Sequence, residues 1–297
     1  MNQTVSRVAV VGGTHGNEIA GVHLLDYWRE NPEQVTRPSF ETECVFANPE
    51  AHRRMTRFLD QDLNRQFGLG DLRDPTLTGY EHSRAKVLDA QLGPKEDPRV
   101  DFVIDLHTTT ANMGLTLVIR ESSPLLLDLV FYIREHMPEA VLFYEPEPRE
   151  EDAFLTSLGR QNGLLIEVGP SPQGLLRADV FELSRRATVH ALDFLHHYNQ
   201  GAVPELPATQ PAFEFVERLG YPLNDRGERW GMVHPDAQDA DYSAVETGAP
   251  LFLTFDGETL TYDGTETRYL AFVNEAAYYK SNVGLELMRR FELKRRP

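Results

Sequence analysis

Cysteine, basic charge and long apolar runs are all scarce in this sequence of 297 residues. The single cysteine, Cys44, excludes an internal disulfide and a metal site built from several thiolates. No stretch approaches the roughly 20 apolar residues of a transmembrane helix, and the segment before Val8 contains no signal-peptide core. We therefore expect a cytoplasmic protein that does not act at a membrane.

Acidic residues outnumber basic ones, 46 to 29, which gives a formal net charge of −17 at pH 7. A charge of this sign opposes binding to nucleic acid and to anionic membranes. If the substrate is an anion, the protein needs a local group of arginines to hold it against the overall field.

Strand-like and helical segments alternate through the first two thirds of the sequence, which predicts an α/β domain. The basic tail, 288–297, is expected to fray or to dock on the surface. The predicted strands are 8–11, 41–47, 100–106, 115–119, 140–144 and 163–170, and the predicted helices are 19–29, 80–92, 125–136 and 178–198.

The composition changes after the last predicted helix. Pro204, Pro207 and Pro211 indicate a linker, and the short strand-like pieces that follow are typical of a small antiparallel β domain. We therefore predict a first domain over residues 1–205 and a second, β-rich domain over residues 206–297.

A glycine-rich loop follows the first predicted strand and carries two candidate metal ligands, His15 and Glu18. Gly12, Gly13 and Gly16 allow turns that a Cβ would resist. An imidazole and a carboxylate at this spacing can bind one cation, and two histidines with one glutamate form a known catalytic zinc set. The pair alone is equally consistent with an ordinary solvated loop.

Two further strands carry polar residues of the same kind. Residues 105 and 107 face the same side of an extended chain, so Asp105 can hold His107 by a hydrogen bond and fix its tautomer. Glu167 lies within the apolar stretch Leu-Leu-Ile-Glu-Val, where a glutamate is rarely buried without a partner. It is either paired structurally or, in a metal cleft, the general base toward water.

The polar segment 48–65 concentrates arginine in an otherwise acidic chain. Such segments are usually loops, and the loops of an α/β scaffold carry binding groups. Arg57 and Arg65 are candidate partners for a substrate carboxylate, because a guanidinium bonds two of its oxygens at once. The alternative is a solvated surface with weak Asp–Arg pairs.

These residues carry a resemblance to the aspartoacylase and aminoacylase-3 family, a branch of the zinc-carboxypeptidase-like hydrolases. The similarity extends over essentially the whole chain. The matching stretches are Gly12–Glu18, Asn48-Pro49, Asp62–Arg65, Asp105–His107, Asn112–Gly114, Ile166–Pro170, Gln173-Gly174, Arg177–Asp179 and Phe272–Tyr279.

The resemblance implies an α/β fold with a zinc-carboxypeptidase-like mixed sheet flanked by helices. A smaller β-rich C-terminal domain would narrow access to the cleft. It also implies one zinc ion per subunit, bound by His15, Glu18 and His107, and a small N-acyl amino acid as the substrate. A homodimer is a further expectation for such a protein.

The resemblance also implies roles for the other candidate residues. Glu167 would activate water and later protonate the leaving amine, and Arg57 would polarise the acyl carbonyl. Asn64 and Arg65 would hold the α-carboxylate of the substrate, and Tyr278 would close over it from the C-terminal domain.

The sequence departs from aspartoacylase proper at positions that hold a substrate's side-chain carboxylate. In an ungapped alignment the family's arginine and lysine fall on Ser157 and Asn282, which carry no charge. Arg160 and Lys280 are nearby candidates to replace them. We expect an aspartoacylase acting on N-acyl-L-aspartate, with an N-acyl aromatic or neutral amino acid as the alternative substrate.

Two other function classes remain open alternatives. A metal-binding protein that has lost turnover would not require Glu167 or Arg57, so the presence of both residues favours an enzyme. A carboxypeptidase acting on peptides would need an open cleft, which the C-terminal domain is expected to narrow.

Overall fold

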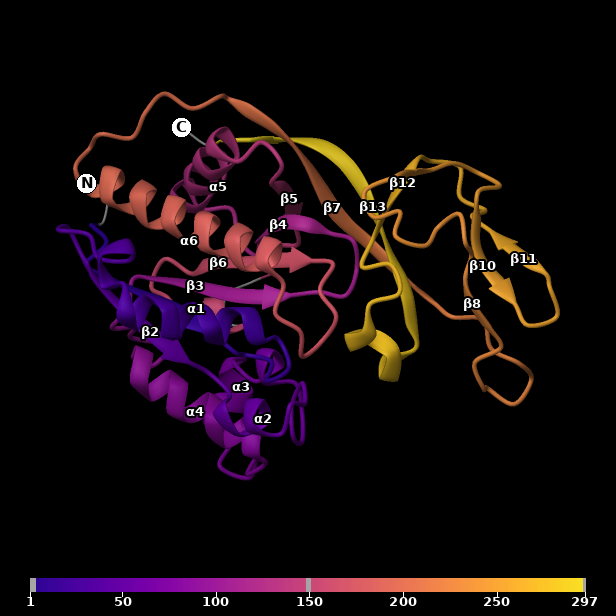
Figure 1. The fold of residues 1–297 in the computed structure, drawn as a ribbon, viewed down its shortest axis with the longest axis horizontal. Helices are drawn as coiled ribbons and strands as arrows, with labels where there is room; N and C mark the ends of the chain where they lie inside the picture. The colour runs from indigo at the N-terminus through magenta and orange to yellow at the C-terminus, as the bar shows by residue number, and fades with distance from the viewer. Residues whose placement is uncertain (1–3, 148–150, 296–297) are drawn as a thin grey trace.

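A mixed sheet of ten strands forms the centre of the computed structural model, which describes residues 4–147 and 151–295 (Figure 1). The order of strands across these residues is β2-β1-β3-β6-β4-β5-β7-β13-β12-β9, which confirms the expected α/β class with a mixed sheet. The strands are β1 (Arg7–Gly12), β2 (Glu41–Phe46), β3 (Phe102–Thr108), β4 (Gly114–Ile119), β5 (Val141–Tyr144), β6 (Gly163–Gly169), β7 (Thr209–Gly220), β9 (Ala244–Val245), β12 (Arg268–Ala271) and β13 (Val283–Lys294).

The first four neighbours in the sheet, β2, β1, β3 and β6, run parallel to one another. Strands β1 and β3 are apolar along most of their length because both of their faces are covered. Parallel strands end at the same edge of a sheet, so the loop after β1, the end of β3 and the end of β6 meet on one side of the molecule.

Helices cover both faces of this sheet (Figure 1). Val8 and Val10 of β1 belong to the core cluster that contains residues of α1, α5 and α6, whereas Ala9 and Val11 belong to the cluster that contains residues of α4, as the alternation of side chains along a strand requires. No helix among the described residues is long and apolar enough to cross a bilayer. The helices are α1 (Ile19–Glu30), α2 (Pro49–Arg53), α3 (Leu69–Arg73), α4 (Tyr80–Leu92), α5 (Pro124–His136) and α6 (Ala178–Asn199), with 3-10 turns η1 (Pro32–Gln34), η2 (Leu63–Arg65), η3 (Leu155–Leu158) and η4 (Ala276–Ser281).

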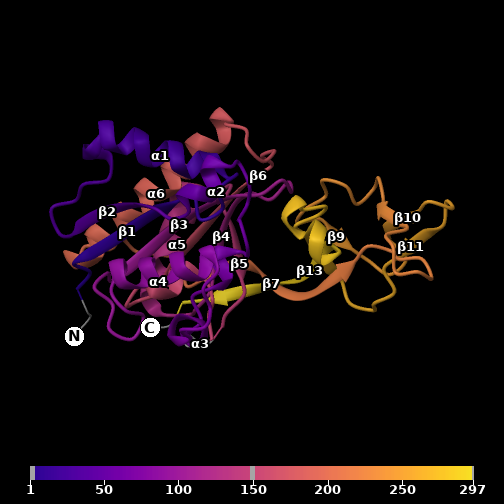
Figure 2. The ribbon, with the colours of Figure 1, turned by 90° about the horizontal axis from the view of Figure 1, so that it is seen from below.

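The C-terminal part, by which we mean the chain from the start of β7 onward, has its own small core and lies at one end of the molecule (Figure 2). The long strands β7 and β13 join it to the central sheet, because β7 pairs with β5 on one side and with β13 on the other. Its second sheet, in the order β11-β10-β8, consists of β8 (Gly231–Val233), β10 (Pro250–Thr254) and β11 (Thr259–Thr261).

Two sequence predictions about this part are wrong. Pro211, expected in a linker, lies inside β7 and pairs with Glu292 of β13. The basic tail does not fray, since residues as far as Lys294 belong to β13. Met288 and Leu293 are buried on this strand, while the arginines between them are exposed. The many basic residues therefore led us to predict a polar tail where the chain forms a half-buried strand.

Candidate active site

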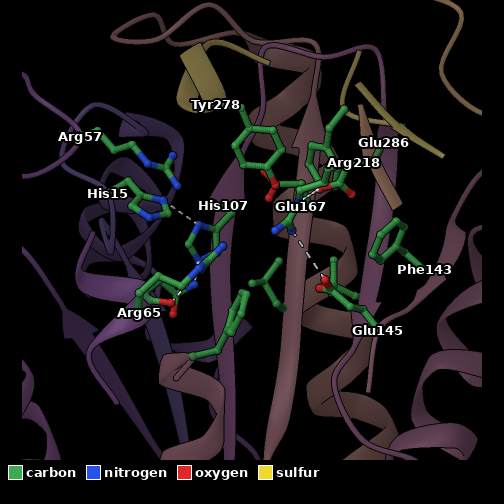
Figure 3. A pocket seen from close by; sticks show the side chains of 15 residues that line it. His15, Arg57, Arg65, His107, Phe143, Glu145, Glu167, Arg218, Tyr278 and Glu286 are labelled. Atoms are coloured by element: carbon green, nitrogen blue, oxygen red, sulfur yellow. Dashed lines mark hydrogen bonds and ion pairs between the residues drawn. The ribbon is translucent and has the colours of Figure 1, made fainter. Parts of the chain in front are cut away.

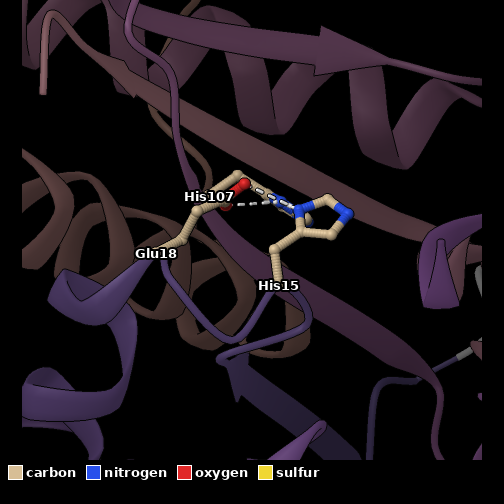
Figure 4. Close-up of side chains that lie close together, drawn as sticks. All are labelled: His15, Glu18 and His107. Atoms are coloured by element: carbon tan, nitrogen blue, oxygen red, sulfur yellow. Dashed lines mark hydrogen bonds and ion pairs between the residues drawn. The ribbon is translucent and has the colours of Figure 1, made fainter. Parts of the chain in front are cut away.

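The three predicted metal ligands, His15, Glu18 and His107, converge beyond the ends of β1 and β3 (Figure 4). His15 Nδ1 lies 2.7 Å from Glu18 Oε1. His107 Nδ1 lies 3.1 Å from both His15 Nδ1 and Glu18 Oε2. All three side chains are buried, and we refer to them below as the donor set.

Backbone geometry fixes the loop that follows β1. Gly13 has a φ of 69°, a left-handed conformation that residues with a Cβ rarely adopt. A Cβ on Gly16 would lie 2.2 Å from the backbone of Ala51, so only hydrogen fits there. Gly16 N also donates to Arg57 O over 3.0 Å, which joins this loop to the arginine-rich segment.

Two carboxylates behind the histidines orient both imidazole rings. Asp105 Oδ2 lies 2.8 Å from His107 Nε2, and Asp62 Oδ1 lies 2.8 Å from His15 Nε2. These contacts favour the tautomer in which Nε2 carries the proton and donates it to the carboxylate. Both Nδ1 lone pairs then point toward Glu18. The sequence suggested the contact of Asp105 but not that of Asp62.

The donor set suits a divalent cation. Ligands bound tetrahedrally to zinc at about 2.0–2.1 Å lie roughly 3.3 Å apart, close to the separations between these atoms. Two imidazole lone pairs that face each other at 3.1 Å repel unless a cation or a proton lies between them. Burial alone would raise the pKa of Glu18, but the interactions of its carboxylate with His15 and His107 outweigh burial and lower that pKa, so the carboxylate is available as a ligand.

Glu167 is the neighbour of His107 in the sheet, because the register of β3 against β6 places the two residues side by side. Its Oε1 is buried and has no hydrogen-bond partner among the described residues. Burial raises the pKa of Glu167 well above its usual value, and the negative charge of Glu18 adds to the rise. A carboxyl group of this kind can exchange a proton with a molecule bound at the donor set.

Arg57 lies against the donor set. Its Nη1 donates to Glu18 Oε1 over 2.9 Å, and its Nη2 donates to Asp62 Oδ2 over 3.0 Å. Burial would lower the pKa of Arg57, but the charges of Asp62 and Glu18 outweigh burial and raise it. The guanidinium therefore stays charged beside the ligands.

Arg65 and Asn64 line the same pocket from η2. The guanidinium of Arg65 stacks 4.2 Å from the ring centroid of Phe154, and its Nη1 donates to Asn64 O over 2.8 Å. No ion pair joins Arg65 to a carboxylate in the described part of the chain. The Asn64 side chain is buried, with Oδ1 accepting from Leu155 N over 2.8 Å and Nδ2 at 3.3 Å from His107 Nε2.

The pocket beside the donor set is lined by residues of both parts of the chain (Figure 3). Tyr278, which lies on η4 of the C-terminal part, is one of the lining residues. The wall also includes five apolar side chains, namely Val118, Phe143, Phe154, Leu165 and Phe272.

Glu275 fixes η4 beside this pocket. Its Oε2 accepts bonds from the backbone N–H of Thr110 at 2.8 Å, from the hydroxyl of Thr110 at 2.9 Å, and from the hydroxyl of Thr109. Its Oε1 accepts from Ala277 N over 2.8 Å and so caps η4. These bonds tie the C-terminal part to the strand end that carries His107.

Sequence reasoning missed three charged residues of the pocket, Arg218 on β7, Glu286 on β13 and Glu145 after β5. Arg218 Nε donates to Glu286 Oε1 over 2.8 Å, and Arg218 Nη2 lies 3.8 Å from Glu145 Oε1. One signal was available, because Glu286 is a lone acid within an apolar stretch, as Glu167 is.

The positions that depart from aspartoacylase lie outside the described lining of this pocket. Ser157 is buried, and its hydroxyl donates to the carbonyl of Phe154 over 2.7 Å. Asn282 ends η4 in a left-handed conformation with a φ of 57°. Neither suggested replacement, Arg160 or Lys280, lines the pocket, and Arg160 bonds a backbone carbonyl elsewhere.

Two domain profiles match the chain in succession. The succinylglutamate desuccinylase/aspartoacylase catalytic domain matches residues 4–195, and the AstE/AspA barrel-sandwich hybrid domain matches residues 208–290. An aspartoacylase of Danio rerio is 41% identical over 94% of this chain and 90% of its own length. A human N-acyl-aromatic-L-amino acid amidohydrolase (carboxylate-forming) is 40% identical over 97% of this chain and 92% of its own length.

A comparison of three-dimensional structures indicates the same family. The crystal structure of murine aminoacylase 3 superimposes with a TM-score of 0.92 at 38% identity, covering 99% of this chain and 98% of the murine chain. The likeness therefore concerns the whole chain rather than a single motif. This chain belongs to the succinylglutamate desuccinylase/aspartoacylase family.

Proposed function

We propose that this protein is a zinc-dependent amidohydrolase that deacylates N-acyl-L-amino acids to a carboxylate and the free amino acid. The observation that carries the proposal is the buried donor set next to Glu167, whose Oε1 has no hydrogen-bond partner among the described residues. The names of the relatives, an aspartoacylase and an N-acyl-aromatic-L-amino acid amidohydrolase, support the same class of reaction.

The donor set would hold one zinc ion through two imidazole nitrogens and one carboxylate. Zinc supplies Lewis acidity, which polarises a carbonyl group and brings the pKa of water to about 7. Asp105 and Asp62 keep the Nδ1 atoms of both rings unprotonated and turned toward Glu18.

Glu167 would move the proton during the reaction. Its ionised Oε1 accepts a proton from water while the water oxygen bonds to the acyl carbon. The neutral carboxyl then gives this proton to the amine nitrogen as the carbon–nitrogen bond breaks. A raised pKa suits both halves of this exchange. Arg57 would donate hydrogen bonds to the oxygen that gains negative charge.

The substrate would be held by groups from both parts of the chain. Arg65, which has no carboxylate partner among the described residues, suits the α-carboxylate of the substrate. Asn64 would assist from the same turn, and Tyr278 would close the pocket from η4. We propose the same division as before, with catalysis in residues 1–205 and a covering domain in residues 206–297.

Two substrate classes fit this chemistry. The Danio rerio relative is named aspartoacylase, and the human relative is named for N-acyl aromatic amino acids. Both classes share the α-carboxylate and the scissile amide, so the donor set, Glu167 and Arg65 serve either equally. The two classes differ in the side chain of the substrate. They must therefore be distinguished by the end of the pocket lined by Arg218, Glu286, Glu145 and Phe143, which we call the side-chain end of the pocket.

Removal of metal tests the proposal. We expect chelator-stripped protein to release no amine from N-acetyl-L-phenylalanine or N-acetyl-L-aspartate, and one equivalent of zinc to restore hydrolysis of at least one of them. His15→Ala should bind zinc poorly and stay inactive, whereas the exposed His23→Ala should behave as wild type. Hydrolysis that survives complete stripping would contradict a metal-dependent mechanism.

A further inference from the structure

The side-chain end of the pocket contains a cation that is already paired. Arg218 reaches into the pocket between the carboxylates of Glu286 and Glu145 (Figure 3). Glu286 is 1% exposed and is the residue opposite Arg218 in the pairing of β13 with β7. The strand register therefore holds the pair together, and neither partner depends on a flexible loop.

Three arginines line the pocket; Arg57 lies beside the donor set, and the other two, Arg65 and Arg218, differ in their partners. Arg65 contacts a backbone carbonyl and an aromatic ring, and no carboxylate pairs with it among the described residues. Arg218 bonds Glu286 directly, with Glu145 at 3.8 Å. Arg65 can therefore accept a new carboxylate at little electrostatic cost, whereas Arg218 cannot do so while Glu286 is ionised.

A second carboxylate on the substrate would meet an unfavourable surface at this end of the pocket. It would approach the buried carboxylate of Glu286, and like charges disfavour a ligand more strongly in a site with little water. Glu145 contributes less to this repulsion, because its Oε2 accepts a hydrogen bond from Arg120 Nη1 over 2.7 Å. The rest of the wall is apolar, formed by side chains such as Phe143 and Leu165. A neutral side chain buries apolar area here and leaves the pair of Arg218 undisturbed.

We propose that Glu286 sets the substrate class by neutralising Arg218, so that the pocket accepts N-acyl amino acids with neutral side chains and discriminates against those with a side-chain carboxylate. This inference rests on the proposed deacylase function and chooses between its two substrate classes. Glu286 thus acts as a specificity-determining residue through Arg218.

The charge of Glu286 changes with pH near neutrality, which makes the proposed selectivity depend on pH. Burial raises the pKa of Glu286 to about 7, and Glu145 adds to the rise while Arg218 and Arg65 oppose it. The neutral form therefore becomes common as the pH falls through 7, and neutral Glu286 releases Arg218 from its charge partner. The charged or titratable groups that face Glu286 are Arg218 on β7, Glu145 after β5, Arg65 on η2, Tyr278 on η4 and Tyr242 before β9.

The two tyrosines that face Glu286 do not change charge in the same range. Burial raises the pKa of Tyr242 and of Tyr278 well above the usual value, so both stay neutral near pH 7. The proton exchange of Glu167 is common to both substrate classes and cancels in a ratio of their rates. The ratio of kcat/KM for an anionic substrate to that for a neutral one therefore reports on Glu286.

The test is this ratio for N-acetyl-L-aspartate against N-acetyl-L-phenylalanine, measured with the zinc-loaded full chain. We expect wild type to favour the phenylalanine substrate and Glu286→Gln to raise the ratio about tenfold or more, since tenfold corresponds to about 1.4 kcal/mol. Glu286→Gln combined with Arg218→Gln should cancel the gain. Glu292→Gln, the same change at an exposed site on β13, should leave the ratio unchanged.

Wild type alone provides a second measurement that does not depend on the folding of a variant. Its ratio should rise as the pH falls from about 8 to about 6, because Glu286 becomes neutral over this range. A ratio that does not change with pH and with Glu286→Gln would overturn the inference, as would a wild type that prefers aspartate at pH 8. Failure to hydrolyse either substrate would instead overturn the proposed function.

Discussion

Two carboxylates outside the donor set fix the orientation of its two imidazole rings. Asp105 and Asp62 each bond the outer nitrogen of a histidine at 2.8 Å, so the inner nitrogens converge. Thr14 in turn donates to Asp105 over 2.7 Å, which fixes the carboxylate itself. The affinity of the site for metal should therefore depend on residues one step removed from it.

Asp105→Asn tests this dependence. The neutral amide can still accept the hydrogen bond of His107 but supplies no negative charge, so we expect zinc affinity to fall about 10- to 100-fold. Competition with a chromogenic chelator measures the affinity, and the exposed Asp26→Asn on α1 is the matched control. Equal affinities for wild type and Asp105→Asn would show that this carboxylate does not tune the site.

At the residue scale, the sequence predicted those side chains that contrast with their own surroundings. His15 and Glu18 stand in a glycine-rich loop, and Glu167 stands in an apolar strand. Arg218 escaped detection because its surroundings in sequence are polar and its partner, Glu286, is 68 residues away. Such a pair becomes visible only when the strands that carry it are known to be neighbours.

At the scale of elements, a buried acid on α4 shapes the loop that carries Arg57. Glu81 is fully buried and accepts hydrogen bonds from three successive backbone N–H groups, those of Leu59 at 2.8 Å, Asp60 at 2.9 Å and Gln61 at 3.3 Å. The part of the arginine-rich segment between α2 and η2 thus takes its shape from a helix that follows it in the chain.

Glu81→Ala should therefore disturb both stability and substrate binding. Loss of the carboxylate leaves several backbone donors without a partner, and we expect the free energy of unfolding to fall by about 3 kcal/mol or more. Chemical denaturation measures this change, with the exposed Glu30→Ala on α1 as the control. A loss no larger than that of the control would mean that other contacts hold the loop.

The element predictions succeeded where an apolar strand or an amphipathic helix was isolated by turn residues. They failed at the first residues of β7 and the last residues of β13, where Pro211 and the arginines of the tail suggested irregular chain. The physical reason is that each of these strands is stabilised by its pairing with the other, over a large separation in sequence. Local residue preference does not record such a pairing.

At the scale of the whole molecule, the C-terminal part completes the pocket instead of only covering it. Arg218, Glu286 and Tyr278 all come from this part, and Glu275 anchors it to the end of β3. The sequence predicted two parts and a covering role for the second. It did not predict that β7 and β13 would continue the central sheet and bring charges to the side-chain end of the pocket.

The central claim is that the donor set and Glu167 together hydrolyse the amide bond of an N-acyl amino acid. The most direct test compares amine release by zinc-loaded wild type and zinc-loaded Glu167→Gln, with the zinc content of both proteins measured in parallel. We expect equal zinc content and a fall in kcat of about 10²- to 10⁴-fold, the range typical of a lost general acid–base. Undiminished turnover by Glu167→Gln with its zinc bound would contradict the account.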